Sequence, residues 1–282
     1  MAKEFKKGKM VPVPSHSIVP ERDVNKLPVL ECQHLGIDFG GLTAVNEFNL
    51  TIGRTEIAGL IGPNGAGKTT VFNLLTKVYQ PTRGTILLNG KDTHGMSTAQ
   101  VNRAGIARTF QNIRLFSELS VLDNVKTGLH NQITYSFAES MFHLGSYRKK
   151  EKQMDEKAME LLSVFGLESV ADYRAANLPY GKQRKLEIAR ALATEPKLLL
   201  LDEPAAGMNP QETLELAQFI REIREKHHLT VFLIEHHMEL VMQISDYIYV
   251  IDFGSEIAQG TPKEVQNNQH VIDAYLGVVE DE

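Results

Sequence analysis

The chain has 282 residues, of which 42% are hydrophobic and 23% charged, and its formal net charge is −5. This composition is typical of a soluble globular protein with ample core for one large or two modest domains, and it does not indicate nucleic acid as a partner. The single cysteine, Cys32, excludes an internal disulfide framework and a cysteine-based metal site, and it is typical of a reducing cytosol.

Residues 1–27 are predicted to form a flexible tail, and one domain is expected to occupy residues 28–282. The tail is basic and rich in proline, shows no hydrophobic periodicity, and lacks the apolar region of a secretory signal. We favour a solvated tail over a docking or membrane-surface role. The sequence has no run of about 18 apolar residues, so we expect no membrane-spanning helix.

Strand patterns begin at Val29, where VLECQHL, a turn at Gly40-Gly41 and the alternating EFNLTI predict strands. Glu56–Ile61 predicts a short buried strand. The helix pattern that follows has apolar residues at i, i+3, i+4 and i+7 over Val71–Val78, which predicts one buried face. GTILLNGKD predicts a further short strand.

Helical patterns replace strand patterns after Asn112, and we expect a mostly helical subdomain over about residues 112–195. Beyond it, strands at Lys197–Asp202 and Leu229–Ile234 and in YIYVID alternate with helices. Continuous apolar strands that alternate with helices predict an α/β fold with a largely parallel sheet covered on both faces. Ligands of such sheets bind at the carboxyl ends of the strands.

A phosphate-binding motif directly follows the strand at Glu56–Ile61. It matches the strand–GxxxxGK[ST]–helix pattern of the P-loop, with the residues Gly62, Pro63, Asn64, Gly65, Ala66, Gly67, Lys68, Thr69 and Thr70. The glycines let backbone N–H groups surround phosphate oxygens, while the helix start and Lys68 add positive charge. Thr69 is placed to offer its hydroxyl to Mg²⁺.

The apolar run Leu198–Leu201 ends in Asp202 and Glu203, and such an ending is costly unless the strand opens on a polar site. Asp202 is predicted to enter the Mg²⁺ shell, and Glu203 to polarise an attacking water. A solvated strand end is the alternative.

His236 follows the strand at Leu229–Ile234, and Gln111 follows IARTF, where it could reach the cation or the water. The pairs His227-His228 and His236-His237 raise the question of a metal site, but no other ligand spacing supports one.

Together these residues resemble the ATP-binding cassette (ABC) ATPases, from about Val29 to the C-terminus. GPNGAGKTT resembles the Walker A motif, LLLLDEP the Walker B motif with its catalytic acid, and LPYGKQR stands where the family has its signature, usually LSGGQ. The resemblance implies a P-loop NTPase cassette with a mostly parallel core sheet, an N-terminal antiparallel β part and a helical subdomain. It also implies that ATP and Mg²⁺ are the ligands.

The resemblance assigns roles to residues outside the Walker motifs. Gln111 falls at the Q-loop, with a role at the metal and the γ-phosphate, and His236 at the switch histidine. Phe39 matches the aromatic that stacks on adenine, with an ordinary core aromatic as the alternative. Gly181 is expected to donate its N–H to the γ-phosphate of a second cassette.

In that family two cassettes pair head to tail, and each signature helix points at the nucleotide of the other. This pairing accounts for the basic residues at the helix start, Lys182, Arg184 and Lys185, although a solvated face or local ion pairs explain them equally well.

Three residues depart from the family pattern. Pro179 replaces the signature serine and has neither a hydroxyl nor an N–H, and Tyr180 replaces the first glycine. Asn209 replaces the usual aspartate of the D-loop. These departures put the activity of the site that this signature completes in doubt, and they leave the Walker site untouched.

The segments ARTFQNIRLFSELSVLDNV, YGKQRKLEIARAL, LDEPAAGMNP and LIEHHMELVM resemble the ATP-binding subunits of branched-chain amino-acid importers. The resemblance implies a location at the cytoplasmic face of the membrane and a second ATPase subunit, in a hetero- or homodimer. It also implies two integral membrane permease subunits, an indirect external solute-binding protein and no nucleic acid. The segment through Arg114 and Phe116 would contact a permease.

Other readings stay open: the ATPase of a lipopolysaccharide exporter or a urea importer, or a non-transport ABC ATPase acting on ribosomes or DNA. A nucleotide-binding module without turnover is a third, which Pro179 and Asn209 favour and Glu203 and His236 oppose.

Overall fold

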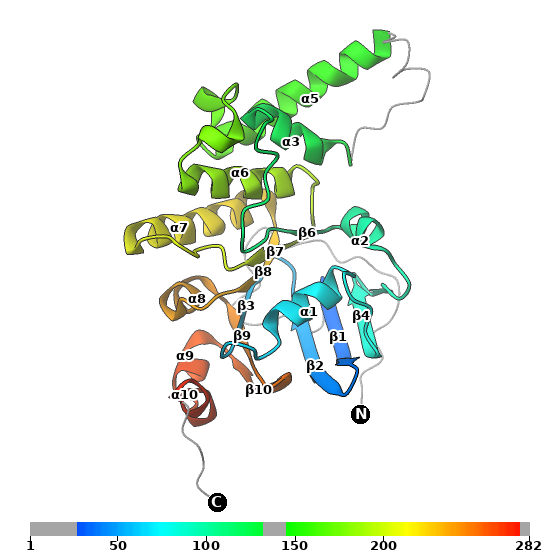
Figure 1. Cartoon of the computed structure of the whole chain (residues 1–282), viewed down its shortest axis with the longest axis vertical. Coiled ribbons are helices and arrows are strands. Elements are labelled where there is room, and N and C mark those ends of the chain that lie inside the picture. Colours follow the sequence, from blue (N-terminus) through cyan, green and yellow to red (C-terminus); the bar gives the residue numbers. More distant parts are fainter. Residues whose placement is uncertain (1–26, 132–144, 277–282) are drawn as a thin grey trace, which may run out of the picture. The chain divides into compact units, whose positions relative to one another are not determined.

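The computed structural model describes residues 27–131 and 145–276. The chain divides into two compact units: unit 1 extends to Ile106 and resumes at Lys197, and unit 2 comprises Ala107–Pro196. The predicted tail lies outside the described residues except for Leu27. Figure 1 shows the helices and strands of both units with the labels used below.

Unit 1 contains an antiparallel sheet near its start, with the strand order β2-β1-β4-β5. Its strands are β1 (Leu30–Phe39), β2 (Leu42–Ile52), β4 (Arg83–Leu88) and β5 (Lys91–Asp92). Cys32 of β1 is buried, and desolvation raises the pKa of its thiol well above the ordinary value. The predicted antiparallel N-terminal β part is confirmed.

The second sheet has the order β10-β9-β3-β8-β7-β6. The strands β3, β7, β8 and β9 run parallel, and β10 pairs with β9 in the antiparallel sense. The bounds are β3 (Ile57–Ile61), β6 (Ile106–Arg108), β7 (Leu198–Asp202), β8 (Thr230–Ile234), β9 (Tyr247–Asp252) and β10 (Ser255–Gly260). Every residue of β3, β7 and β8 is buried, which is why these strands read as continuous apolar runs.

The helices of unit 1 are α1 (Lys68–Leu75), α2 (Thr98–Ala104), α7 (Pro210–His227), α8 (Met238–Ile244), α9 (Pro262–Gln266) and α10 (Gln269–Leu276). Apolar side chains of α1 pack in one cluster with residues of both sheets, and the rings of Phe72 and Phe232 lie 5.2 Å apart there. The predicted α/β fold is therefore confirmed, with a mostly parallel sheet and helices packed against it.

The prediction that Val78 lies on the buried face of α1 is wrong. The helix ends at Leu75, and the hydroxyl of Thr76 donates to the carbonyl of Phe72. Lys77 then takes a left-handed conformation with φ 58°, which turns the chain away, and Val78 is 53% exposed. A period of 3.6 residues cannot report where a helix ends.

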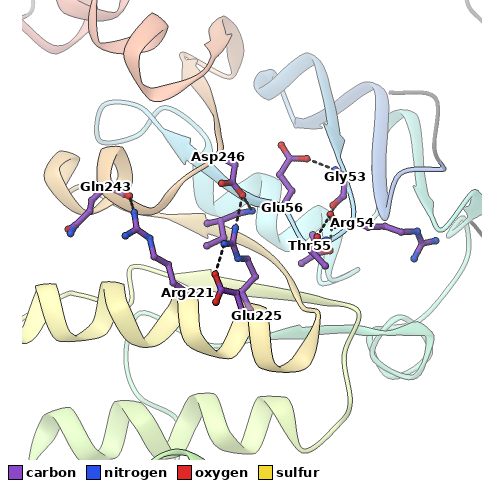
Figure 2. Close-up of polar contacts among 11 residues, drawn as sticks. Gly53, Arg54, Thr55, Glu56, Arg221, Glu225, Gln243 and Asp246 are labelled. Carbon is purple, nitrogen blue, oxygen red and sulfur yellow. Dashed lines mark hydrogen bonds and ion pairs between the residues drawn. The ribbon is translucent and has the colours of Figure 1, made fainter. Parts of the chain in front are cut away.

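A polar cluster joins the amino-terminal ends of the parallel strands to α7 (Figure 2). The carboxylate of Asp246 accepts the N–H of Ile57 at 2.8 Å and a hydrogen bond from Arg224 at 3.1 Å. Arg221 donates to the carbonyl of Gln243. Burial raises the pKa of Asp246, and the two donors act in the opposite direction. These bonds anchor the amino-terminal end of β3, which is opposite to the end that leads into the P-loop.

Apart from Ala107 and Arg108 at the end of β6, the described part of unit 2 is built from helices, turns and loops. Its helices are α3 (Val121–Leu129), α5 (Gly145–Val164) and α6 (Tyr180–Leu192), with 3₁₀ turns at Glu168–Val170 and Ala175–Asn177. Met154, Ala158, Leu162 and Phe165 are buried at helical spacing, so α5 and the turn after it supply a core face to this unit.

Candidate nucleotide-binding and hydrolysis site

The P-loop connects the end of β3 to the start of α1. At Gly62 a Cβ would lie 2.0 Å from the carbonyl oxygen of Ile251, and at Gly67 it would lie 2.8 Å from that of Ala44. Gly67 is also left-handed, with φ 104°. Both positions therefore require glycine, because any side chain would collide with backbone.

Lys68 closes this loop on itself. Its Nζ donates to the carbonyl oxygens of Gly62 at 2.7 Å and Pro63 at 2.8 Å, and the side chain is buried. Burial lowers the pKa of Lys68, while the negative charge of Glu203 raises it in part. A desolvated ammonium at the N-terminus of α1 favours an anion in the loop.

Glu203 and His236 lie after the carboxyl ends of neighbouring parallel strands. Asp202 of β7 is paired with Ile234 of β8, and the N–H of Glu203 donates to the carbonyl of Ile234 at 2.9 Å. The Nε2 atom of His236 then lies 2.6 Å from Oε1 of Glu203. The structure thus brings together two residues that were predicted separately.

The backbone of Glu203 is left-handed, with φ 46°, a conformation that costs a non-glycine residue about 1–2 kcal/mol. The surrounding hydrogen bonds hold it there. This backbone conformation directs the Glu203 side chain towards His236. The strained turn is therefore part of what brings the two side chains into contact.

Glu235, which no sequence pattern singled out, holds the two turns in place. Its side chain is 1% exposed, and its carboxylate accepts the N–H of Ala205 at 2.7 Å, that of His236 at 2.9 Å and that of His237 at 3.2 Å. One buried acid therefore links the turn after β7 to the turn after β8. The available signal was a carboxylate at the end of a wholly apolar strand.

Thr69 and Asp202 are the predicted Mg²⁺ ligands in unit 1. Thr69 lies in the first turn of α1 and is exposed, and Asp202 is buried at the end of β7. A hydroxyl and a single carboxylate fit Mg²⁺, which usually takes one or two carboxylates and completes its shell with phosphate oxygens and water. Among the described residues no group of three or more His, Cys, Asp or Glu side chains could hold a metal ion, and His237 bonds to Glu235.

Phe39 ends β1 with 42% of its surface exposed, so it is not an ordinary core aromatic. Its ring lies 5.1 Å from that of Tyr79 in an edge-to-face arrangement. Tyr79, which the sequence analysis also missed, follows α1 and fixes the orientation of Phe39. A third missed residue is Tyr275 of α10: burial raises the pKa of its phenol to about 12, and a backbone hydrogen bond from Gly62 opposes this shift.

The signature segment and Gln111 belong to unit 2. Pro179 is the N-cap of α6 and makes no side-chain capping bond, and Gly181 lies in the first turn, where a Cβ would meet nothing within 4 Å. Tyr180 and Gln111 are exposed. The first turn of α6 is thus open at Gly181.

The three basic residues of α6 do not share one environment. Lys182 is exposed, Lys185 is half-buried, and Arg184 is completely buried in an ion pair with Glu187 at 2.9 Å. For Arg184 the local ion pair is therefore the correct explanation.

Asn209 caps α7 rather than standing free. Its side chain accepts the N–H of Glu212 at 3.0 Å, the carboxylate of Glu212 accepts the N–H of Asn209, and Pro210 opens the helix. This reciprocal pair is a capping box. Its role across an interface stays a prediction.

Residues 45–206, more than half of the chain, match the family model of the ABC transporters, and the chain belongs to this family of ATP-binding cassette ATPases. Residues 256–281 match a model described as a branched-chain amino acid ATP-binding cassette transporter. None of the helices described is long and apolar enough to cross a membrane.

The chain is 48% identical over 250 residues to the high-affinity branched-chain amino acid transport ATP-binding protein LivG of Escherichia coli K12. The alignment covers 89% of this chain and 98% of LivG. BraF of Pseudomonas aeruginosa, described in the same words, is 46% identical with the same coverage. The lipopolysaccharide export ATP-binding protein LptB of Escherichia coli K12 is 32% identical.

Among solved structures, an ATP-binding cassette of an ABC transporter in its ADP conformation aligns with a TM-score of 0.78 and 30% identity over 89% of this chain and all of that one. A nucleotide-free cassette aligns with a TM-score of 0.76 and 29% identity, covering 88% of this chain and 98% of the other.

Proposed function

We propose that this ABC ATPase powers a branched-chain amino-acid importer by hydrolysing Mg-ATP. The observation that carries turnover is the 2.6 Å contact between Glu203 and His236. The likeness to LivG and BraF supports the solute class, because the greater identity lies with these proteins and the smaller with LptB.

ATP binds in the P-loop with its adenine on the exposed ring of Phe39. Lys68 exchanges its bonds to Gly62 and Pro63 for bonds to phosphate oxygens, so its charge is delivered to the phosphates. Thr69, Asp202 and Gln111 would hold Mg²⁺, and the bound ion would supply positive charge next to the phosphates.

Glu203 takes a proton from the attacking water as general base. His236 holds the Glu203 carboxylate in place in the free protein and contacts the γ-phosphate once ATP is bound. Gln111 senses the same phosphate. Gly181 donates its N–H to the nucleotide of a second cassette, in a hetero- or homodimer at the cytoplasmic face of a membrane with two permease subunits.

Replacement of Glu203 by glutamine tests turnover. In the assembly co-expressed with its permease subunits, Glu203→Gln should bind ATP with parental affinity, because the P-loop is unchanged. Its kcat should fall by about 100-fold or more, because the general base is lost. Radiolabelled ATP binding and phosphate release measure the two quantities.

Lys68→Ala is the matched variant, because it should abolish tight binding itself. Near-normal hydrolysis by Glu203→Gln would transfer the role of base to another group. Uptake of leucine by vesicles that contain the assembly then tests the solute class. Vesicles that hydrolyse ATP without leucine-dependent stimulation would favour export or another solute.

The second candidate, a nucleotide-binding module without turnover, is favoured by Pro179, which removes the hydroxyl of the signature. It predicts tight ATP binding and no phosphate release from the parental assembly. The same two measurements therefore separate it from the ATPase.

A further inference from the structure

Arg184 and Glu187 of α6 form an ion pair in the interior of unit 2. Their side chains are 0% and 2% exposed, and Nη1 of Arg184 lies 2.9 Å from Oε2 of Glu187. Removing two charges from water is costly unless their other donors and acceptors are also bonded. Here four further bonds go to the backbone of the segment 110–114. Arg184 also donates to the hydroxyl of Tyr180 at 3.3 Å, and its Nε has no hydrogen-bond partner among the described residues.

These bonds run in both directions. Arg184 donates to the carbonyl oxygens of Phe110 at 2.6 Å and Gln111 at 2.8 Å. Glu187 Oε1 accepts the N–H of Arg114 at 3.1 Å and that of Phe110 at 3.4 Å. The Arg184–Glu187 pair therefore holds the segment by its carbonyls and its amides, on both sides of the Gln111 side chain.

Contacts further along α6 continue the attachment. Arg190 donates to the carbonyl of Arg114, and its guanidinium lies 5.4 Å from the centre of the Phe116 ring. The guanidinium of Arg114 lies 4.4 Å from the ring of Phe110, so the segment is also packed against itself.

We propose that Arg184 and Glu187 are positioning residues that make the Gln111 segment and the start of α6 a single rigid body. The proposal rests on the proposed function, which assigns both Gln111 and Gly181 to nucleotide. Arg184 lies three residues after Gly181 and bonds the carbonyl of Gln111 itself, so a movement of either is transmitted to the other through one side chain.

Stability alone does not account for this pair. Apolar residues of similar volume can replace buried ion pairs without loss of stability, and often with a gain. Apolar side chains cannot, however, bond the backbone C=O and N–H groups of segment 110–114. The double variant Arg184→Met/Glu187→Leu therefore keeps the packing and removes the attachment.

A distance measurement tests the rigid body without any need for catalysis. Cysteines introduced at the exposed positions Asn112 and Lys182 carry spin labels in the full-length chain. We expect a narrow distance distribution in the parent and at least a twofold broader one in the double variant, at a similar melting temperature. An equally narrow distribution in a folded double variant would overturn the proposal.

Turnover in the co-expressed assembly is the second readout. The double variant should keep the parental ATP dissociation constant within about twofold, because the P-loop is unchanged. Its kcat should fall at least tenfold, because movement of Gln111 is no longer coupled to movement of Gly181. Glu187→Gln, which retains an acceptor for the two N–H groups, should lose less; it also serves if the double variant does not fold.

Arg174→Ala is the matched control, because it removes an arginine from an exposed ion pair with Glu118 in the same unit. Its kcat and label distances should equal those of the parent. Parental kcat in the double variant would refute the positioning role. A parental assembly that hydrolyses no ATP would refute the proposed function instead, and the label distances would still decide on the rigid body.

Discussion

At the scale of single residues, the site is defined by charges placed in shielded positions. Lys68 is desolvated against its own loop, and Glu203 is held in a left-handed turn against His236. Neither arrangement is favourable by itself, so each depends on neighbours that fix it. Glu235 fixes the second, because its buried carboxylate bonds both turns.

Burial lowers the pKa of Lys68, and this gives ATP binding a pH dependence. Between the lowered pKa and the ordinary value, part of the free protein has a neutral Lys68. A bound triphosphate adds negative charge and restores the proton, so binding takes up protons and affinity falls as the pH rises. Calorimetry at alkaline pH, towards the ordinary lysine pKa, should show a decline in affinity of at most tenfold per pH unit.

Lys68→Arg is the control for this titration, because a guanidinium keeps its proton throughout the range. Its affinity, even if weaker overall, should not change with pH. A flat profile for the parent, with no proton uptake in buffers of different ionisation enthalpy, would contradict the lowered pKa.

At the scale of elements, local signals were predictable and long-range ones were not. The P-loop, its strand and its helix are contiguous, so spacing alone located them. The contact of Glu203 with His236 depends on β7 lying next to β8, and sequence does not give the order of strands in a sheet. Glu235 was missed for the same reason, since its partner Ala205 lies thirty residues away.

Arg184 illustrates the same limit on a helix. From sequence, a nucleotide of a second cassette, a solvated face and a local ion pair were all open for this residue. The structure shows an ion pair with Glu187 and two bonds to segment 110–114, which lies far from Arg184 in sequence. Glu187, three residues further on, was the available local signal, because i and i+3 residues share a helix face.

Asn209 allows its capping role to be separated from a role at an interface. Asn209→Ala should lower the free energy of unfolding by about 1 kcal/mol, because α7 loses its N-cap. Asn209→Asp retains a capping oxygen and should leave stability nearly unchanged. Urea unfolding of the isolated chain measures both. Equal stability of the parent and the alanine variant would show that the cap contributes nothing.

At the scale of the whole molecule, the residues that we propose to contact nucleotide are divided between two units. The P-loop, Glu203 and His236 belong to unit 1, and Gln111 and Gly181 to unit 2. In the proposed cycle, the Arg184–Glu187 pair couples Gln111 to Gly181 within unit 2. The proposed contact with a second cassette is made through the signature segment.

Pro179→Ser tests that segment in the assembly. A serine hydroxyl can donate to the γ-phosphate of the second cassette, and one such bond contributes about 1 kcal/mol, or roughly fivefold in kcat/KM. Pro179→Ala, which restores only the N–H, is the control for backbone effects. Equal rates for the serine and alanine variants would exclude a hydroxyl contact at this position.

The buried thiol of Cys32 allows local opening of the antiparallel sheet to be measured. The thiol is enclosed by the antiparallel sheet and remains protonated, so alkylating reagents attack it only in molecules whose sheet has opened. Because it is the only thiol in the sequence, its alkylation reports local unfolding of the sheet. The extent of modification, read by mass spectrometry, then gives the free energy of that opening without any foreign probe.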